Sequence, residues 1–348
     1  MRSAVRPHSS GVRGLALVAA SVAALLALPS APALAAGPRE AAAPSPAAHG
    51  QAPDGARVVS AVQVGERQTD LTIDSPALRG TAKVRLLTPE GWERRTPGQR
   101  WPTLWLLHGC CNDYTSWTKD LDVASVAQLR HVLVVMPEAG AAGFYSDWRQ
   151  LPGAQAPAWE SFHLREVLPL LREGYGAGSR QAVAGLSMGG FGALSYTARH
   201  PGLFRSAASY SGVTDTLRTP ADSDFVQGLV TSAGAAPEAL WGDPDRDRKV
   251  WAAHNPADLA PALAGTPLFV SSGDGTAGPY DTPGTTDATE RLLHEENVSL
   301  LAALRTAHAR HLHADLYGPG THTNPYWRRE FLRSLPMLLT SVGVPAHG

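Results

Sequence analysis

The sequence has few cysteines and almost no net charge. Its 348 residues include 2 cysteines, and 30 lysines and arginines against 31 aspartates and glutamates leave a formal charge of −1. A chain without a basic excess offers no electrostatic footprint for a phosphate backbone, so we expect no nucleic-acid partner. Because Cys110 and Cys111 are adjacent, they cannot cross-link distant segments; a vicinal disulfide and free thiols both fit the sequence. Two neighbouring thiols also lack the spacing of a tetrahedral metal site.

An apolar run long enough to span a membrane is missing as well. Residues 14–28 are predominantly apolar, follow three arginines and precede the small residues Ala33 and Ala35, which is the pattern of a secretory signal peptide. A membrane-spanning helix needs about 20 apolar residues, which disfavours the alternative of an N-terminal anchor. We therefore predict a signal peptide at residues 1–35 and no transmembrane segment after its removal. The mature protein is then secreted, to the extracellular space or the cell envelope.

The rest of the chain divides into a leader and one domain. Residues 36–56 are rich in Ala and Pro and predict a disordered leader, and residues 57–344 have the size of a single α/β domain. No internal repeat is visible. The β-like runs are residues 58–62, 70–73 and 82–87, which predict an antiparallel edge, then 103–107, 131–137, a run ending at Gly185, 206–212, 266–273 and 311–317. The helical runs are residues 161–175, 191–199, 286–308 and 324–339.

The pentapeptide Gly-Leu-Ser-Met-Gly at residues 185–189 lies between a β-like run and a helical run. This order of strand, sharp turn and helix is typical of a nucleophile elbow, where Gly185 and Gly189 allow strand and helix to approach closely. Ser187 is therefore the candidate nucleophile. The N–H of Met188, at the start of the helix, is a candidate donor to an oxyanion. The alternative is a glycine-rich turn that happens to contain a serine.

The strand at residues 103–107 ends in His108 and Gly109. Ligands of open α/β sheets gather at the carboxyl ends of strands, so the N–H of Cys110 is the second candidate oxyanion donor. His108 is an alternative general base. Its place before the nucleophile favours a structural or substrate-side role instead.

The candidate base is His322, on a glycine-rich loop after the last strand, where a histidine can reach the elbow. His311 and His313 lie in a strand pattern and are expected on strand faces. The acid of a triad belongs on the loop after the strand at residues 266–273, where Asp281 and Asp274 are the candidates.

Two further segments have weaker patterns. Residues 213–240 predict an irregular, partly helical insertion, placed in chain order where a lid over Ser187 is expected. Asp243, Asp245 and Asp247 have a spacing that suggests calcium, but the glycine and the glutamate of a calcium loop are missing. A solvated turn is the preferred interpretation.

With these residues placed, the chain resembles the esterase D and antigen 85 (mycolyltransferase) family of α/β-hydrolases from about residue 70 to residue 331. Beyond the elbow, the resemblance depends on Leu106-Leu107-His108-Gly109 with Trp117, Met136-Pro137 with Phe144-Tyr145-Ser146-Asp147-Trp148, Trp241-Gly242 with Trp251 and Asn255-Pro256, and Gly320-Thr321-His322 with Trp327. It implies a mostly parallel central sheet with helices on both faces, no cofactor or metal, and acyl transfer through a seryl ester. It supports Ser187 as nucleophile and His322 as base. It also supports the amides of Met188 and Cys110 as the oxyanion hole.

The resemblance is less complete for the acid. The transferases of this family use a glutamate a few residues past a Gly-Asn-Gly-Thr turn. Here the matching turn at residues 273–276 is followed by no glutamate before Glu290. With a short insertion Asp281 occupies the equivalent place, and Asp274 is the alternative.

Other departures concern the substrate. Where the mycolyltransferases have an acidic residue, an arginine and a tryptophan that help to bind trehalose, this chain has His108, Cys111 and Asn324. That argues against trehalose as acceptor. His108, Trp148 and Asn324 are the candidates for the substrate pocket.

Three functions follow from these residues. The first is a secreted carboxylesterase that hydrolyses small or medium acyl esters through a Ser-His-Asp triad. The second passes the acyl group to a sugar or glycerol hydroxyl, as a mycolyltransferase or diacylglycerol acyltransferase does. The third is a non-catalytic binding protein of the cell surface, which the intact Ser187 and His322 disfavour.

Overall fold

The structure is a computed structural model that describes residues 50–153 and 155–345. The predicted signal peptide and most of the predicted leader lie outside these residues. The strands are β1 Arg57–Gly65, β2 Gln68–Ser75, β3 Gly80–Leu87, β4 Trp101–Leu107, β5 Leu133–Pro137, β6 Ala177–Leu186, β7 Ala207–Tyr210, β8 Leu268–Ser272 and β9 Leu312–Leu316. The α-helices are α1 Ser116–Lys119, α2 Trp159–Ser161, α3 Leu168–Gly174, α4 Met188–Arg199, α5 Pro220–Ser232, α6 Arg248–Ala252, α7 Ala260–Leu263, α8 Ala288–Thr306 and α9 Asn324–Ser341. Short 3₁₀ turns are η1 Trp92–Arg94, η2 Val123–Ser125, η3 Ala127–His131 and η5 Pro237–Ala239, and η4 Phe162–Val167 is a π-helical stretch between α2 and α3.

The strands form one sheet whose two halves differ in direction. Its order is β1-β2-β3-β5-β4-β6-β7-β8-β9. The pairs from β1 to β5 are antiparallel, and the pairs from β5 through β4 to β9 are parallel. The predicted antiparallel edge and mostly parallel sheet are therefore confirmed.

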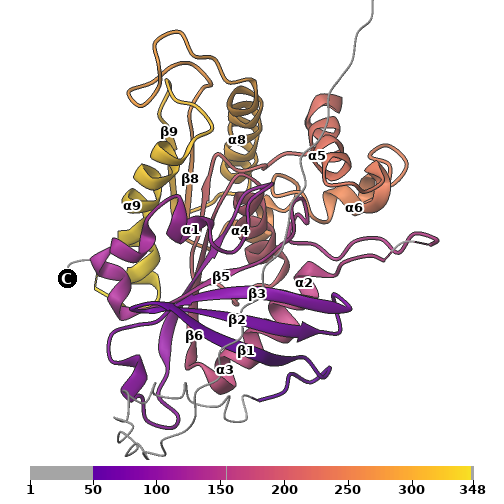
Figure 1. The fold of residues 1–348 in the computed structure, drawn as a ribbon. Coiled ribbons are helices and arrows are strands. Elements are labelled where there is room, and N and C mark those ends of the chain that lie inside the picture. The colour runs from indigo at the N-terminus through magenta and orange to yellow at the C-terminus, as the bar shows by residue number, and fades with distance from the viewer. Residues whose placement is uncertain (1–49, 154, 346–348) are drawn as a thin grey trace, which may run out of the picture. The chain divides into compact units, whose positions relative to one another are not determined.

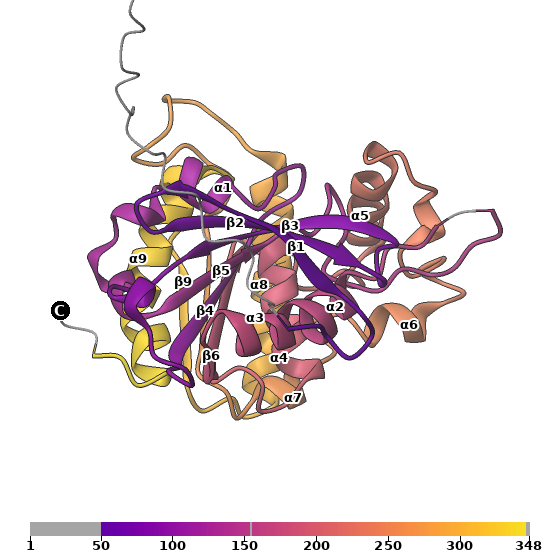
Figure 2. The same ribbon diagram turned by 60° about the horizontal axis from the view of Figure 1, so that its bottom comes forward.

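Helices cover both faces of the parallel half. Alternate residues of a strand point to opposite faces, so Trp105 and Leu107 of β4 pack in one apolar cluster with side chains of α3, α4 and α8. Leu104 and Leu106 pack in a second cluster with side chains of α1 and α9. Figure 1 and Figure 2 show α9 on one side of the strands and α3 and α4 on the other. The carboxyl ends of β4 and β6 are thereby held between two layers of helix.

The beginning of the packed domain corrects one expectation. The sequence predicts a leader up to residue 56, yet Ala52 and Ala56 are buried in the first apolar cluster. Gln51 also pairs with Arg57 in an antiparallel bridge. The domain therefore includes these residues, because their small side chains fill space beside β1.

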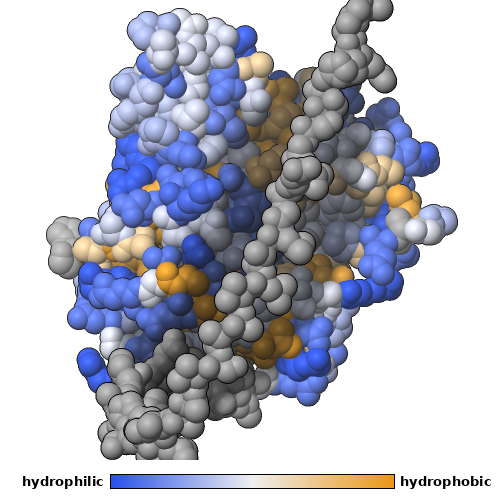
Figure 3. All heavy atoms as spheres, viewed as in Figure 1, coloured by the Kyte–Doolittle hydropathy of each residue, from blue (hydrophilic) through white to orange (hydrophobic). Residues whose placement is uncertain are grey.

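The surface is mixed in character. Within residues 50–153 and 155–345 no helix combines the length and the apolar content needed to cross a bilayer. The face in Figure 3 is mainly hydrophilic, with smaller hydrophobic patches between polar residues. Exposed apolar side chains include Val59, Val62 and Val64 on β1.

Candidate active site

Ser187 lies on a sharp turn between β6 and α4. Its backbone has φ 54° and ψ −122°, a conformation that a non-glycine residue rarely adopts. The turn is held by hydrogen bonds from the Ser187 N–H to the Tyr210 carbonyl, at 2.9 Å, and from the Gly190 N–H to the Ser187 carbonyl, also at 2.9 Å. A Cβ on Gly185 would collide with the Gly189 carbonyl, and one on Gly189 would collide with the Leu107 carbonyl. The two glycines are thus needed where strand, turn and helix meet.

His322 lies between Ser187 and a buried carboxylate. Its Nε2 is 2.9 Å from Ser187 Oγ, and its Nδ1 is 2.7 Å from Glu290 Oε2. A carboxylate only accepts, so Nδ1 carries the proton and Nε2 is free to accept from the serine hydroxyl. The His322 N–H also donates to Asp287 Oδ2, at 2.9 Å. The ring and its backbone are therefore both fixed by the start of α8.

Glu290 is fully buried in the first turn of α8. Besides His322, it accepts hydrogen bonds from Ser211 Oγ at 2.8 Å and from the Gly273 N–H at 2.6 Å. A buried carboxylate needs such donors, because removing its charge from water is costly without them. The site thus contains a chain of hydrogen bonds from Glu290 through His322 to Ser187.

The structure does not bring the two predicted acids to His322. Asp281 accepts from Thr321 Oγ1 and from the Tyr326 hydroxyl, each at 2.6 Å, and Asp274 accepts from the N–H and hydroxyl of Thr276. Burial raises the pKa of Asp281, but the hydrogen bonds from Thr321 and Tyr326 more than offset this, and the pKa lies below its ordinary value. The carboxylate that contacts His322 is that of Glu290, so the prediction that an aspartate lies at this place is wrong.

The reason for this error is a loop that closes on itself. Asp287 N–H donates to the Gly275 carbonyl at 2.8 Å, and Thr276 and Thr286 form an antiparallel bridge. Residues 277–285 therefore form an inserted loop whose two ends are held together. α8 begins directly after this loop, close to the residues that precede it. The available signal was an aspartate three residues before a glutamate at a helix start, which is a capping pattern; Asp287 Oδ1 does accept from the Glu290 N–H, at 3.0 Å.

The loop after β4 lies beside the nucleophile. A Cβ on Gly109 would lie 3.2 Å from Ser187 Cβ, so this backbone passes next to the serine. Met188 is the first residue of α4, and the first N–H groups of a helix have no acceptor within the helix. Met188 therefore follows Ser187 at the start of α4, and Gly109, the residue before Cys110, lies beside Ser187 in space. That Met188 and Cys110 donate to an oxyanion stays a prediction.

Known proteins match this chain both in sequence and in fold. A family model named Esterase matches residues 75–338. Esterase Rv1288 of Mycobacterium tuberculosis (strain H37Rv) is 31% identical over 232 residues, which are 63% of this chain and 48% of that protein. The chain thus spans about half the length of that relative. Diacylglycerol acyltransferase/mycolyltransferase Ag85B of Mycobacterium intracellulare is 27% identical over 259 residues, covering 71% of this chain and 77% of that protein. The crystal structure of Mycobacterium tuberculosis MPT51 (FbpC1) superposes with a TM-score of 0.62 at 21% identity, covering 78% of this chain and 96% of MPT51.

The chain belongs to the esterase family. The predicted resemblance to esterase D and antigen 85 proteins and the α/β-hydrolase fold are confirmed. The named relatives are an esterase and a diacylglycerol acyltransferase/mycolyltransferase.

The two cysteines of the chain form a vicinal disulfide. Cys110 and Cys111 are bonded to each other, with their Cα atoms 3.8 Å apart. Cys111 has a positive φ of 65°, and its N–H donates to the Ala141 carbonyl at 2.8 Å. Of the two possibilities that the sequence left open, the structure has the disulfide, and it lies in the loop beside Ser187.

The three pocket candidates lie in different surroundings. His108 is 1% exposed, and both ring nitrogens face backbone groups, so it is not in the position of a base or of a substrate contact. Trp148 is partly buried and donates from Nε1 to the Gly143 carbonyl at 3.0 Å. Asn324 is the first residue of α9, two positions after His322. Asn324 stays a pocket candidate on this placement, whereas His108 is removed from the list.

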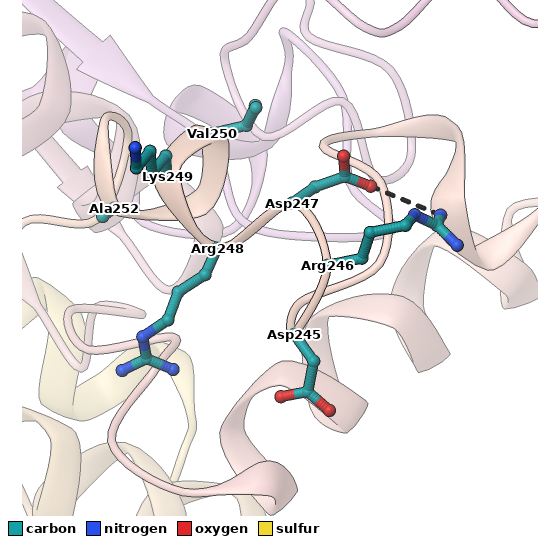
Figure 4. Close-up of a pocket in the computed structure, with 7 residues that line it drawn as sticks. All are labelled: Asp245, Arg246, Asp247, Arg248, Lys249, Val250 and Ala252. Atoms are coloured by element: carbon teal, nitrogen blue, oxygen red, sulfur yellow. Dashed lines mark hydrogen bonds and ion pairs between the residues drawn. The ribbon is translucent and has the colours of Figure 1, made fainter.

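The aspartates at 243, 245 and 247 form a turn with ion pairs. Asp247 accepts from Arg149 at 2.7 Å and from Arg246 at 3.3 Å, and Asp243 Oδ1 accepts from the N–H of Asp245 at 3.1 Å. Figure 4 shows Asp247 facing Arg246 while Asp245 points away from both. The surface pocket that the figure draws, lined by residues 245–250 and Ala252, contains neither Ser187 nor His322. The carboxylates do not converge, which agrees with a solvated turn.

The segment predicted as a lid begins at the nucleophile turn. The Val213 N–H donates to the Ser187 carbonyl at 3.3 Å, and the segment then forms α5, whose start is capped by Thr219 and Asp222. It is more regular than the sequence suggests, because this capping box and Pro220 start a helix firmly. Its action as a lid stays a prediction.

Proposed function

We propose that this esterase hydrolyses carboxylic esters through an acyl-enzyme on Ser187, with His322 as general base and Glu290 as its acidic partner. The hydrogen bonds of 2.7 Å and 2.9 Å that join Glu290, His322 and Ser187 carry the proposal. A serine hydroxyl is a weak nucleophile until a neighbouring base accepts its proton. The proposed triad is therefore Ser-His-Glu rather than Ser-His-Asp.

The proposed reaction has two halves. Ser187 Oγ attacks the ester carbonyl carbon while His322 Nε2 takes the hydroxyl proton, and the tetrahedral intermediate collapses when His322 gives that proton to the leaving alcohol. Water then attacks the acyl-enzyme, His322 takes and returns a proton in the same way, and the carboxylic acid leaves Ser187. Glu290 keeps the proton of His322 on Nδ1 and stabilises the imidazolium that forms in each half.

The oxyanion of both tetrahedral intermediates is placed between the N–H groups of Met188 and Cys110. The helix N-terminus at Met188 and the approach of Gly109 to Ser187 support this assignment. Each such donor is typically worth about 10²- to 10³-fold in rate.

Transfer to a hydroxyl acceptor is the second candidate function. The relative Ag85B is named a diacylglycerol acyltransferase/mycolyltransferase, and the same acyl-enzyme can be attacked by an alcohol instead of water. Product analysis with and without glycerol or a sugar separates the two. A product ester that forms only with the polyol supports transfer, and free acid alone supports hydrolysis.

We also propose that the enzyme is secreted. The support is the signal-like pattern of residues 1–35, which lie outside the described residues. Expression of the full chain with and without residues 1–35, followed by N-terminal sequencing of the exported protein, tests this. Cleavage after about residue 35 agrees with the proposal; a full-length chain that stays in the membrane contradicts it.

The first test of activity is hydrolysis of a p-nitrophenyl ester series, from acetate to palmitate. We expect the wild-type protein to cleave part of the series and Ser187→Ala to lose at least about 10³-fold in kcat. Ser209→Ala is the matched control, because Ser209 is a buried serine on the neighbouring strand whose hydroxyl has no hydrogen-bond partner among the described residues. It should retain wild-type activity. Absence of cleavage in the wild type, together with no transfer to a polyol, contradicts the proposed function and favours the binding role.

A further inference from the structure

The backbone that carries Cys110 is held at three consecutive places. The His108 carbonyl accepts from the Tyr145 hydroxyl at 2.8 Å, and the Gly109 carbonyl is 2.8 Å from the Nδ1 of His108. The N–H of Cys111 donates to the Ala141 carbonyl, also at 2.8 Å. The peptide units before, at and after Cys110 are therefore each fixed by a partner.

The ring of His108 faces a backbone group with each of its two nitrogens. Because the Gly109 carbonyl can only accept, Nδ1 carries a proton. The Ala139 N–H lies 3.0 Å from Nε2, which accepts from it, and the same N–H is 3.1 Å from Glu138 Oε1. The nearest oxygen of Glu138 is 3.6 Å from Nε2, too far for a hydrogen bond. With 1% of its surface exposed, His108 touches backbone rather than substrate.

The contact between His108 and the Gly109 carbonyl has a geometric consequence for Cys110. The Gly109 carbonyl and the Cys110 N–H belong to one planar, trans peptide unit, in which they point in opposite directions. A partner that fixes the direction of the carbonyl therefore also fixes the direction of the N–H. Gly109 passes next to Ser187, so the orientation of this peptide unit decides whether the N–H can reach an oxyanion formed on Ser187.

We propose that His108 is a positioning residue that aims the Cys110 N–H at the oxyanion. This inference depends on the proposed function, since it concerns an intermediate formed on Ser187. His108 acts through the Gly109–Cys110 peptide and contacts neither the substrate nor the nucleophile. Its imidazole donates to the Gly109 carbonyl in place of water. The Tyr145 hydroxyl donates in the same way to the His108 carbonyl, one peptide earlier.

Two substitutions of His108 separate aiming from packing. In His108→Asn the amide nitrogen occupies the place of Nδ1 and can still donate to Gly109. In His108→Gln the amide reaches the place of Nε2, so the link to Ala139 is kept and the donor to Gly109 is lost. Both are buried polar amides that remove the ring, which makes each the control for the other.

The measurements are kcat and KM for a p-nitrophenyl ester, the affinity of an alkyl trifluoromethyl ketone, and the melting temperature. The ketone forms a tetrahedral adduct with an oxyanion, so its affinity reports the oxyanion hole. We expect His108→Gln to lose about 10- to 100-fold in kcat and a similar factor in ketone affinity, at unchanged KM. This loss is smaller than that caused by removing an oxyanion donor, because the N–H is still present but points in another direction. His108→Asn should stay within about threefold of wild type on both measures.

Equal losses in the two variants, or a loss of ketone affinity that merely follows the melting temperature, would overturn the inference. If neither variant folds, Tyr145→Phe is the second test, since it removes only the hydroxyl at the His108 carbonyl. It should lower kcat and ketone affinity by one common factor, and no change in either overturns the inference. A wild-type protein that cleaves no ester contradicts the proposed function instead, so the two failures are distinguishable.

Discussion

The nucleophile turn and the segment that carries the acid meet at one histidine, but they are built differently. At the turn, β6, Ser187 and α4 are continuous in sequence, and every constraint acts over a few residues. The acid segment runs from Gly273 to Glu290 and contains an inserted loop at residues 277–285. The two ends of this loop are joined only by hydrogen bonds between residues that are distant in sequence. A local constraint is visible in the sequence as a motif, whereas an inserted loop changes the sequence spacing between the residues on its two sides.

The largest test of this comparison exchanges the two rival acids. Glu290→Gln should lower kcat by about 10³- to 10⁴-fold, because a glutamine does not hold His322 in the tautomer that accepts from Ser187 or stabilise its charge. Asp281→Asn is the matched control. It should change kcat by less than about tenfold, because Asp281 contacts Thr321 and Tyr326 and not His322. Steady-state kinetics on one p-nitrophenyl ester decide this, and the reverse order of the two effects would restore Asp281 as the acid.

A second test breaks the nucleophile turn itself. In Gly189→Ala the new Cβ would collide with the Leu107 carbonyl and lie 2.7 Å from the His108 carbonyl. We expect about 10²-fold lower kcat, since α4 and the loop after β4 must move apart at the oxyanion site, and a loss of stability of about 1–3 kcal/mol.

The control for Gly189 is a helical glycine in open space. Gly228→Ala in α5 meets no atom within 4 Å, so it should leave kcat unchanged and raise stability by up to about 1 kcal/mol. Kinetics and thermal melting of both variants check the prediction. A Gly189→Ala enzyme as active as Gly228→Ala would show that the close approach at the turn is not needed.

A third test concerns the start of α8, where one residue serves both the helix and the base. Asp287 accepts from the Glu290 N–H through Oδ1 and from the His322 N–H through Oδ2. Asp287→Ala should lose about 1 kcal/mol of stability through the helix cap and about tenfold in kcat through looser placement of His322. Asp287→Ser keeps a capping oxygen but cannot reach both donors. It should recover the melting temperature and not kcat, and recovery of both would mean that the contact with His322 is unimportant.

These two regions also show how far the sequence leads. The alternation of runs predicted the sheet and the main helices, and the motif at residues 185–189 predicted the serine turn, because spacing within one turn or strand is local. His322 was placed correctly beside Ser187 because it follows the last strand directly. Glu290 was missed because the bridge between Thr276 and Thr286 cannot be read from spacing. The role of the His108 ring was likewise hidden, since it depends on which backbone groups face the two nitrogens.

A final and smaller effect connects the two regions through α8. Glu296, six residues after Glu290 on the same helix, accepts from the N–H groups of Thr214 and Asp215 behind the nucleophile turn. Burial raises its pKa from 4.5 to about 8, with the neighbouring charges of Asp222 and Asp215 adding to the effect. Since the folded state then keeps a proton that the unfolded state releases above pH 4.5, the free energy of unfolding should fall as pH rises from 4.5 towards 8.

Glu296→Gln tests this, because a glutamine oxygen still accepts from the two N–H groups and does not titrate. Urea unfolding at about pH 5 and about pH 8 should show a smaller difference in stability for this variant than for the wild type. Glu295→Gln changes an exposed glutamate at the preceding position and should keep the wild-type difference. If both variants keep it, Glu296 is not the group that titrates, and the contact between α8 and the segment behind Ser187 is insensitive to pH in this range. If only Glu296→Gln reduces the difference in stability between the two pH values, then ionisation of Glu296 on α8 weakens the packing of α8 against the segment behind Ser187.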